Sequence, residues 1–183
     1  MNKITAIPCF NPSRIVCYDL ETTGTNPKLD EILQISAING DGEVLINTYV
    51  KPRFHSSWPF AERVNHISAT DVADAPTIIE LLPQIQGIFN SAKTIVGYNH
   101  RHFDNRFLNE LGIEFNQDSL QDDVMMDYAK LINQRNQSGK GLKCFKLIEC
   151  AKHFDYIFNP HDSLSDAKAT LYCFKKIQEL KYR

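Results

Sequence analysis

Two carboxylates stand one residue apart where an apolar stretch of the chain ends. Residues 15–24 read Ile-Val-Cys-Tyr-Asp-Leu-Glu-Thr-Thr-Gly, and the apolar start predicts a buried strand. Side chains on a strand alternate between its faces, so Asp19 and Glu21 point the same way. Two carboxylates that close repel each other when buried, so the pair needs a divalent cation such as Mg²⁺ or Mn²⁺. A strand that simply ends in solvent has the same spacing, and further carboxylates are needed to decide.

Three side chains from later parts of the sequence could take part in the same chemistry. Asp104 lies at the start of a predicted helix, where an acid also complements the helix dipole. Asp166 follows Ser163 by three residues, a spacing similar to a capping box. His161 precedes the same helix and, taken alone, is typical of a surface histidine. Each residue has an ordinary structural explanation, so the prediction depends on their combination.

The combination follows the order and separation of a known family. The segments are Asp-Leu-Glu-Thr-Thr-Gly at 19–24, Gly-Tyr-Asn-His-Arg-His-Phe-Asp at 97–104 and His-Asp-Ser-Leu-Ser-Asp-Ala at 161–167. Through them the sequence resembles the DnaQ-like 3′-5′ exonucleases of the DEDDh class, which includes the proofreading epsilon subunit of DNA polymerase III. The resemblance covers about residues 14–180, almost the whole chain. Residues 64–68 also look like the family's segment between the third strand and the next long helix.

The resemblance implies an α/β fold of the RNase H-like type, with a mixed five-stranded sheet flanked by helices on both faces. It implies that four acids hold two Mg²⁺ or Mn²⁺ ions, with Asp19 bridging both, and that His161 is the general base. Two ions about 4 Å apart activate the attacking water and stabilise the leaving 3′ oxygen. An imidazole titrates near neutral pH, as a base should. The implied metal ligands are Asp19, Glu21, Asp104 and Asp166.

The resemblance also implies a binding surface for the 3′-terminal nucleotide. The turn after the first acids would hold the sugar and phosphate, with Gly24 leaving room for close approach. A sandwich of His66, Ile67 and Phe103 would hold the base. Plain core packing also explains Ile67 and Phe103, and a turn also explains Asn99. The expected substrate-binding residues are Leu20, Thr22, Thr23, Gly24, His66, Ile67, Asn99 and Phe103.

Around these residues the pattern predicts strands first and then helices that alternate with short strands. Strands at 31–39 and 43–50 continue the first strand into a three-stranded meander, with a hairpin turn at 39–42. A buried strand is predicted at 93–97. Pro83 either kinks the helix predicted at 78–89 or marks the start of a later one. The other predicted helices are a short one after Pro59 and those at 103–111, 124–134, 144–154 and from 163 onward.

The composition indicates one globular domain. The chain has 183 residues, a formal net charge of −2 and five cysteines that form no Cys-x-x-Cys pair. We therefore expect reduced thiols and a cytoplasmic location. No run of about 20 apolar residues predicts a membrane span, and the first residues lack the apolar core of a signal peptide. The expected organisation is an extended arm at 1–13 followed by an exonuclease domain at 14–183.

Three functional hypotheses follow. The first is a metal-dependent exonuclease that acts on the 3′ end of single-stranded or frayed DNA and releases nucleoside 5′-monophosphates. The alternative is a 3′-5′ exoribonuclease similar to RNase T or oligoribonuclease, which share the same acids. The third is a catalytically silent nucleic-acid-binding module on the same scaffold. It is disfavoured because the four acids and His161 are all present.

The sequence says less about partners. A net charge of −2 argues against coating long nucleic acids, whereas bound metal ions would convert an acidic pocket into a phosphate site. Lys140, Lys143 and Lys146 would follow the incoming backbone or form an ordinary solvated surface. No stretch of this sequence resembles the long tail that attaches a proofreading subunit to its polymerase, so we expect a stand-alone nuclease. A polymerase partner and a homodimer both stay open.

Overall fold

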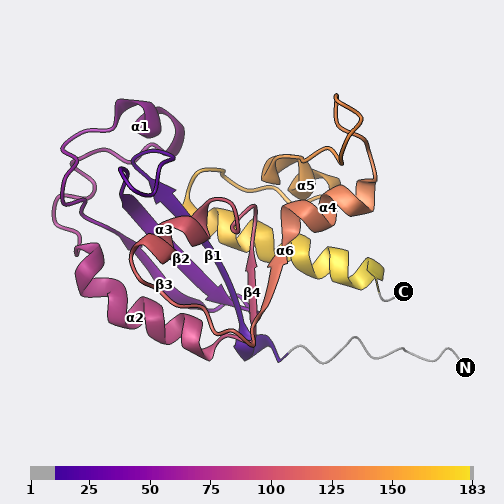
Figure 1. Cartoon of the computed structure of the whole chain (residues 1–183), viewed down its shortest axis with the longest axis horizontal. Coiled ribbons are helices and arrows are strands. Elements are labelled where there is room, and N and C mark those ends of the chain that lie inside the picture. Colours follow the sequence, from indigo (N-terminus) through magenta and orange to yellow (C-terminus); the bar gives the residue numbers. More distant parts are fainter. Residues whose placement is uncertain (1–10, 182–183) are drawn as a thin grey trace, which may run out of the picture.

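A mixed five-stranded sheet forms the centre of the molecule (Figure 1). The computed structural model describes residues 11–181. The strands lie in the order β3-β2-β1-β4-β5, with β1 antiparallel to β2 and parallel to β4. The expected α/β fold with a five-stranded mixed sheet is therefore confirmed. The strands are β1 (Ile15–Thr22), β2 (Ile32–Asn39), β3 (Val44–Tyr49), β4 (Thr94–Gly97) and β5 (Leu120–Asp123).

The first three strands form the predicted antiparallel meander. In the pairing of β1 with β2, Asp19 lies opposite Ser36 and Glu21 lies opposite Gln34. The predicted hairpin turn joins β2 to β3, and Gly42 within it has φ 89°, a conformation that glycine adopts without strain. The pairing fixes which side chains of β2 lie beside the two acids.

The edge strand β5 was not among the strands predicted from the sequence pattern. Its residues, Leu-Gln-Asp-Asp, contain no apolar run, and only Asp123 is buried. The strand forms because β4 provides a parallel partner, with Thr94 opposite Leu120 and Gly97 opposite Asp123. A strand that depends on its neighbour more than on its own hydrophobic pattern leaves little signal in a single sequence.

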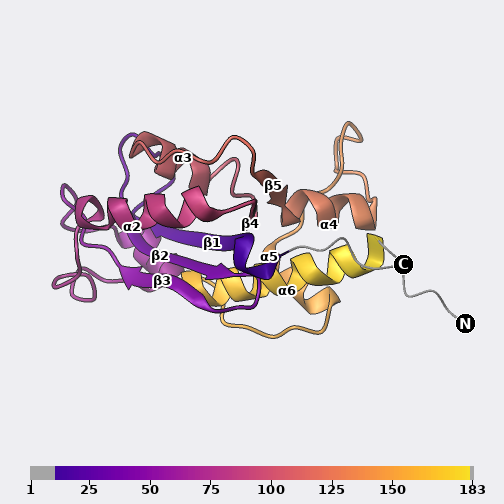
Figure 2. The same ribbon diagram turned by 90° about the horizontal axis from the view of Figure 1, so that it is seen from below.

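Helices cover both faces of the sheet, as Figure 2 shows from below. One hydrophobic core packs α2 and α3 against the sheet, and a second core packs α4, α5 and α6 against the opposite face. The predicted two-sided arrangement is confirmed. The helices are α1 (Pro59–Asn65), α2 (Ile78–Ser91), α3 (Asp104–Glu110), α4 (Val124–Ile132), α5 (Leu147–His153) and α6 (Ser163–Lys181).

The central strand β1 contributes to both cores because its side chains alternate. Tyr18 lies in the core with α2 and α3, and Cys17 lies in the core with α6. The Cys17 thiol donates a hydrogen bond to the carbonyl oxygen of Ala167 on α6, with 3.3 Å between sulfur and oxygen. By the same alternation, Asp19 and Glu21 point to the face that α6 covers.

Helix α2 runs unbroken from Ile78 to Ser91, so Pro83 lies inside it and does not start a later helix. The Glu80 carboxylate accepts the N–H of Thr77 at 2.7 Å and caps the helix start. Pro83 cannot donate to the carbonyl of Ile79. Because Ile79 is half-exposed, water can reach that carbonyl, which reduces the cost of an internal proline.

Helix α5 begins at Leu147, three residues later than the predicted start at residue 144. The carbonyl oxygen of Phe145 accepts the hydroxyl of Tyr98 at 2.8 Å. This contact holds the segment before α5 against the end of β4 in an extended conformation. The helix start is also fixed locally, because the Glu149 carboxylate accepts the N–H of Lys146 at 2.7 Å.

Most of the expected N-terminal arm, residues 1–10 with Cys9, lies outside the described residues. Its last part, Pro12–Arg14, is a 3-10 helix, and the Pro12 carbonyl accepts the N–H of Gly40 at 2.9 Å. The four cysteines in the described part are free thiols. Between residues 11 and 181, no helix is both long enough and apolar enough to cross a bilayer.

Candidate active site

The carboxyl end of β1 and the first turns of α3 and α6 meet in one pocket of about 440 Å³. Three segments far apart in the sequence therefore contribute to a single cavity. The pocket contains every residue that the sequence predicted to hold metal or to act as base: Asp19, Glu21, Asp104, His161 and Asp166.

Strand β2 fixes the start of α6 beside the two acids of β1. Gln34, opposite Glu21 in the sheet, accepts the N–H of Ser163 through Oε1 at 3.2 Å. Ser36, opposite Asp19, shares a 2.7 Å hydrogen bond between its Oγ and the Oγ of Ser163. Because Ser163 is the first residue of α6, these bonds hold the helix start next to the carboxylates.

Asp166 can face the pocket because another acid caps the helix. Asp162 accepts the N–H of Ser165 through Oδ1 at 2.9 Å, which is the capping role that the sequence pattern also allowed for Asp166. Asp166 Oδ2 accepts the N–H of His161 at 3.1 Å. Asp166 Oδ1 is buried and has no hydrogen-bond partner among residues 11–181. A buried, unpartnered carboxylate oxygen fits a metal ligand.

Asp104, the first residue of α3, forms a hydrogen bond with the backbone of β1. It is 3 % exposed, and its Oδ1 accepts the N–H of Leu20 at 3.1 Å. That N–H lies between Asp19 and Glu21 along β1. Complementing the helix dipole does not require burial, so the location of Asp104 fits a site residue better.

Burial and mutual repulsion make it hard for these acids to ionise together. Burial, followed by the charges of Asp166 and Asp104, raises the pKa of Glu21 to about 8. Burial is also the main cause that raises the pKa of Asp104 to about 7 and that of Asp166 to about 7. The pKa of Asp19 is raised by burial and then by Asp104 and Asp166. At neutral pH the ionised cluster therefore needs a positive partner.

The donor set fits divalent metal ions. One ligand atom each from Glu21, His161 and Asp166 lies within 4.8 Å of the other two. Carboxylate oxygens are the ligands that Mg²⁺ and Mn²⁺ prefer. Asp19 and Asp104 supply two more carboxylates to the same pocket.

His161 has the exposure and the protonation state of a base. Its side chain is exposed at the pocket, and its backbone has φ 67° in the left-handed region. Burial lowers the pKa of its imidazole below the usual value, and the nearby positive charges of His66 and Lys146 lower it further. The lowered pKa favours the neutral ring, which is the form able to accept a proton.

Most of the expected substrate-binding residues line the same pocket. Thr22 Oγ1 donates to the carbonyl oxygen of Gly24 at 2.6 Å, which closes the turn after the acids. A Cβ atom at Gly24 would lie 2.5 Å from the carboxylate of Asp30. A larger residue here would displace the Asp30 carboxylate, which holds the turn by accepting the N–H of Asn26 at 2.8 Å, a reason for glycine that the sequence did not suggest. The lining residues from the expected set are Leu20, Thr22, Thr23, Gly24, Asn99 and Phe103.

Phe103 and Asn99 each combine the two explanations that the sequence left open. The Phe103 ring packs against the core with its centroid 5.3 Å from that of Phe107, and it also lines the pocket. Asn99 is a turn residue with φ 61°, and its N–H donates to Asp123 Oδ1 at 3.0 Å. Both residues are therefore structural and accessible to a ligand.

His66 and Ile67 are not among the lining residues of the pocket. Ile67 is 3 % exposed and packs with Leu33 and Val72 in a small separate core. Its carbonyl oxygen accepts the Trp58 indole N–H at 2.6 Å. His66 is exposed at the C-terminal cap of α1, with φ 59°. The structure thus packs Ile67 as the core residue that the alternative interpretation described.

Helix α1 supplies lining residues that the sequence reasoning missed. Phe60 is 80 % exposed and, with Val64 one turn later, lines the pocket. Asn65 is buried, donates to the carbonyl oxygen of Thr22 at 3.2 Å and lowers the pKa of Glu21 by hydrogen bonding. The available signal was two apolar residues four apart on an otherwise polar short helix.

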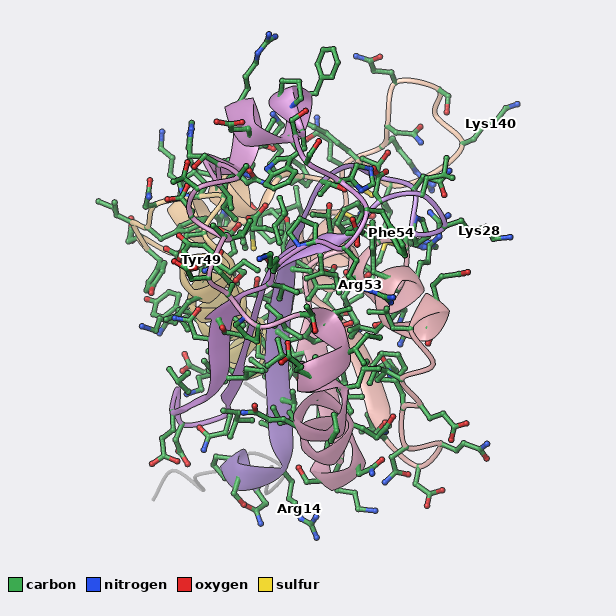
Figure 3. The ribbon with its side chains drawn as sticks, turned by 90° about the vertical axis from the view of Figure 1, so that its left-hand side faces the viewer. Arg14, Lys28, Tyr49, Arg53, Phe54 and Lys140 are labelled. Carbon is green, nitrogen blue, oxygen red and sulfur yellow. The ribbon has the colours of Figure 1, made fainter. Side chains whose placement is uncertain are left out.

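The three lysines proposed to follow the nucleic acid do not line the pocket. Lys140 projects from the loop between α4 and α5, as Figure 3 shows. Lys143 Nζ lies 4.5 Å from the ring centroid of Phe145. Only Lys146 is close enough to lower the pKa of His161. Their role as a backbone track stays a prediction.

Comparisons with known proteins agree on the family. The model of the exonuclease family matches residues 16–174. The chain is 30% identical over 172 residues to the PolC-type DNA polymerase III of Caldanaerobacter subterraneus and 31% identical over 172 residues to that of Clostridium perfringens. Each match covers 90% of this chain, and the chain spans 11% of the length of these curated relatives.

Solved structures of exonuclease I share the fold. An Escherichia coli exonuclease I in complex with a dA16 oligonucleotide aligns with a TM-score of 0.69 and 20% identity, over 91% of this chain and 42% of that chain. A zinc-bound complex of E. coli exonuclease I with single-stranded DNA aligns with a TM-score of 0.73 and 22% identity, over 90% of this chain and 40% of that chain. At this identity the likeness concerns the fold.

Proposed function

Because the chain belongs to the DnaQ-like 3′-5′ exonuclease family, we propose that it removes nucleotides from the 3′ end of single-stranded or frayed DNA. The products are nucleoside 5′-monophosphates. The observation that carries the proposal is the convergence of four carboxylates from β1, α3 and α6 in one pocket, three of them with a pKa of about 7 or 8. Such a cluster is stable in its ionised form only with bound cations.

The four acids Asp19, Glu21, Asp104 and Asp166 would hold the metal ions. Bound Mg²⁺ or Mn²⁺ supplies positive charge that activates water and stabilises the leaving 3′ oxygen. His161 accepts the proton of the attacking water on its neutral imidazole, since its pKa is lowered. The water oxygen bonds to phosphorus, the bond from phosphorus to the 3′ oxygen breaks, and that oxygen takes up a proton. Asn65 supports the site by holding the Thr22 carbonyl.

The terminal nucleotide would lie between the two sides of the pocket. Phe103 and Leu20 line the pocket together with Phe60 and Val64 of α1, and all four offer apolar surface. Stacking on such surfaces tolerates every base, because each base has a flat face. This tolerance suits an enzyme that must accept any 3′ end.

A labelled single-stranded DNA oligonucleotide with Mg²⁺ tests the proposal. Asp19→Ala is expected to abolish release of mononucleotide, and chelation of the metal is expected to do the same. Asp41→Ala, which removes an exposed carboxylate outside the pocket, is the matched control and should retain activity. Unchanged hydrolysis in Asp19→Ala, or hydrolysis that survives chelation, would rule the mechanism out.

DNA is favoured over RNA as the substrate because the curated relatives are DNA polymerases and the similar structures contain DNA oligonucleotides. The same assay with RNA of the same sequence tests the exoribonuclease alternative, which faster RNA hydrolysis would support. Binding of either oligonucleotide without release of mononucleotide would instead support a catalytically silent module. The relatives also motivate the proposal that the substrate arises in DNA replication or repair.

A further inference from the structure

A second groove lies next to the candidate active site. It has a volume of about 150 Å³ and is lined by the loops at 27–31 and 50–54 and by one side of α3. Residues 22–25 line the active-site pocket, so the turn that ends β1 passes from one cavity to the other. Phe107 in the groove also contacts Phe103 in the pocket, with 5.3 Å between ring centroids. The two cavities are therefore neighbours on one surface.

The loop that borders this groove is held by a single carboxylate. Glu31 accepts the backbone N–H groups of Arg53 at 2.6 Å and of Phe54 and His55 at 2.9 Å each. His55 Nδ1 also lies 2.9 Å from Glu31 Oε2. Three backbone donors on one carboxylate fix the loop conformation before any ligand binds. The loop is thus preorganised, which reduces the entropy that binding must overcome.

On this fixed loop, a large aromatic ring points to solvent. Phe54 is 80 % exposed and Leu29 across the groove is 70 % exposed. The Arg53 guanidinium lies over the Phe54 ring, with its Cζ 5.1 Å from the ring centroid. Figure 3 shows Arg53, Phe54 and Lys28 on the same face of the molecule. An apolar surface held in place next to cations is typical of a binding site.

The groove offers three cations that an anionic ligand could contact. Lys28, Lys51 and Arg53 are exposed there, and within residues 11–181 none of the three forms an ion pair. The acids of the groove are less available. Glu31 is occupied by the loop, and Asp30 accepts the N–H of Asn26 at 2.8 Å and the Thr23 hydroxyl at 3.3 Å. The three lining acids, Asp30, Glu31 and Glu110, equal the three cations in formal charge, but two of them point their oxygens at donors of the chain itself.

We propose that this groove binds the segment of single-stranded nucleic acid that precedes the 3′-terminal nucleotide. A base stacks on Phe54, and Arg53 and Lys28 neutralise the phosphates on either side. Exposed cations interleaved with an aromatic ring are the pattern of single-strand binding without sequence preference. The groove adjoins the pocket, because Thr23 of the pocket donates to Asp30 of the groove at 3.3 Å, and this position makes the substrate strand its occupant. The inference rests on the proposed function, because it assigns the groove to the substrate of the neighbouring site.

Substrate length separates the groove from the active site. We expect Phe54→Ala to raise KM about fivefold or more on a single strand of about twelve nucleotides, since stacking on one aromatic residue accounts for at least that much. Arg53→Gln should also raise KM, because it removes the charge that neutralises a phosphate. Neither variant should change kcat or the hydrolysis of a dinucleotide, which cannot reach the groove. Tyr49→Ala removes an aromatic side chain that is 40 % exposed on β3, outside the groove, and is the matched control.

Salt dependence tests the charged part of the proposal. Each phosphate contact on a single strand contributes about 0.7 to the slope of log affinity against log salt concentration. Arg53→Gln and Lys28→Gln should each reduce that slope by about this amount, whereas Phe54→Ala should weaken binding without changing the slope. Fluorescence anisotropy with the same oligonucleotide, measured in Asp19→Ala protein so that no product forms, gives these slopes.

The two proposals fail in different ways. If the wild-type protein hydrolyses neither the long strand nor the dinucleotide, the proposed function is wrong, and the anisotropy measurements still decide the groove. If it hydrolyses both but Phe54→Ala and Arg53→Gln leave KM, affinity and salt slope for the long strand unchanged, the groove assignment is wrong. A protein partner would then be the better occupant of this surface.

Discussion

Asp166 illustrates what frees a side chain for chemistry. Asp162 immediately precedes α6, and Asp166 lies in its first turn. Asp162 takes the cap through Ser165, and Asp166 keeps one buried oxygen without a partner in the described chain. Because Asp162 caps α6, the Asp166 carboxylate is available to the pocket and the helix start keeps its cap.

His161, whose backbone N–H donates to Asp166, leads to a prediction about catalysis. His161→Ala should lower kcat by about a hundredfold to ten-thousandfold, the usual contribution of a general base. KM for the oligonucleotide and affinity for Mg²⁺ should not change, since the ring is assigned to proton transfer. Steady-state kinetics and metal titration by calorimetry measure these quantities. His102→Ala, an exposed histidine outside the pocket, should behave as wild type.

The geometry also permits a result that contradicts this role. A ligand atom of His161 lies within 4.8 Å of ligand atoms of Glu21 and Asp166. If His161→Ala lost affinity for Mg²⁺ together with turnover, the imidazole would be a metal ligand and the base would have to be found elsewhere.

Between the elements, side-chain hydrogen bonds fix the arrangement that packing alone leaves approximate. Asp123, at the end of β5, accepts the N–H of Met125 at 3.1 Å and caps α4. The same Oδ1 accepts the N–H of Asn99 at 3.0 Å, in the turn between β4 and α3. A single oxygen thus connects an edge strand, a helix start and the turn that leads to Asp104.

We therefore expect Asp123→Ala to lower the free energy of unfolding by about 2 kcal/mol, the combined cost of a lost cap and a second hydrogen bond. Asp123→Asn retains the accepting oxygen and should lose less than half as much. Urea denaturation followed by circular dichroism measures both variants. Equal losses would mean that the carboxylate charge, rather than the hydrogen bonds of Oδ1, stabilises this junction.

In the whole molecule, the sheet separates the two cores, and its central strand β1 carries Asp19 and Glu21 near its carboxyl end. The cores stabilise the fold on both faces, and the pocket acids oppose it when they ionise. Burial raises the pKa of Glu21 to about 8 and those of Asp104 and Asp166 to about 7, whereas unfolded carboxyl groups titrate near 4. The folded state therefore binds more protons across this range.

The sign of the effect gives a stability prediction. A group with a raised pKa in the folded state binds its proton more tightly there, so stability falls as pH rises from about 4 to about 8. Metal-free protein should therefore have a higher Tm at pH 5 than at pH 8. Asp104→Asn should reduce the difference, because it removes one of the titrating groups. Thermal unfolding in the presence of a chelator measures it.

Bound Mg²⁺ should oppose the loss of Tm between pH 5 and pH 8. Cations that bind the ionised acids stabilise the folded state and release protons, so Mg²⁺ should raise Tm more at pH 8 than at pH 5. Asp41→Ala protein, with the pocket intact, should show the wild-type response. A Tm that is independent of both pH and Mg²⁺ would contradict the assignment of the pocket as a metal site.

The sequence predicted the elements that local interactions determine better than those that depend on contacts between distant parts of the chain. The meander, α2, α3 and α6 follow from local hydrophobic periodicity and capping, and the prediction was accurate there. Strand β5 depends on pairing with a neighbouring strand, so no local hydrophobic pattern predicted it. Phe60 and Asn65 were missed because a short polar helix reveals its role only by where it packs.

The sequence by itself determined that Asp19 and Glu21 share one face of a strand, because the period of a strand is a local property. It also supplied Asp104, Asp166 and His161 at the starts of helices, through family resemblance. Only the tertiary structure decided that these residues meet, since Gln34 and Ser36 bring the start of α6 to β1 by hydrogen bonds across more than a hundred residues. It also decided that Ile67 is core and that Phe54 is exposed, because burial is a property of the whole fold rather than of the residue type.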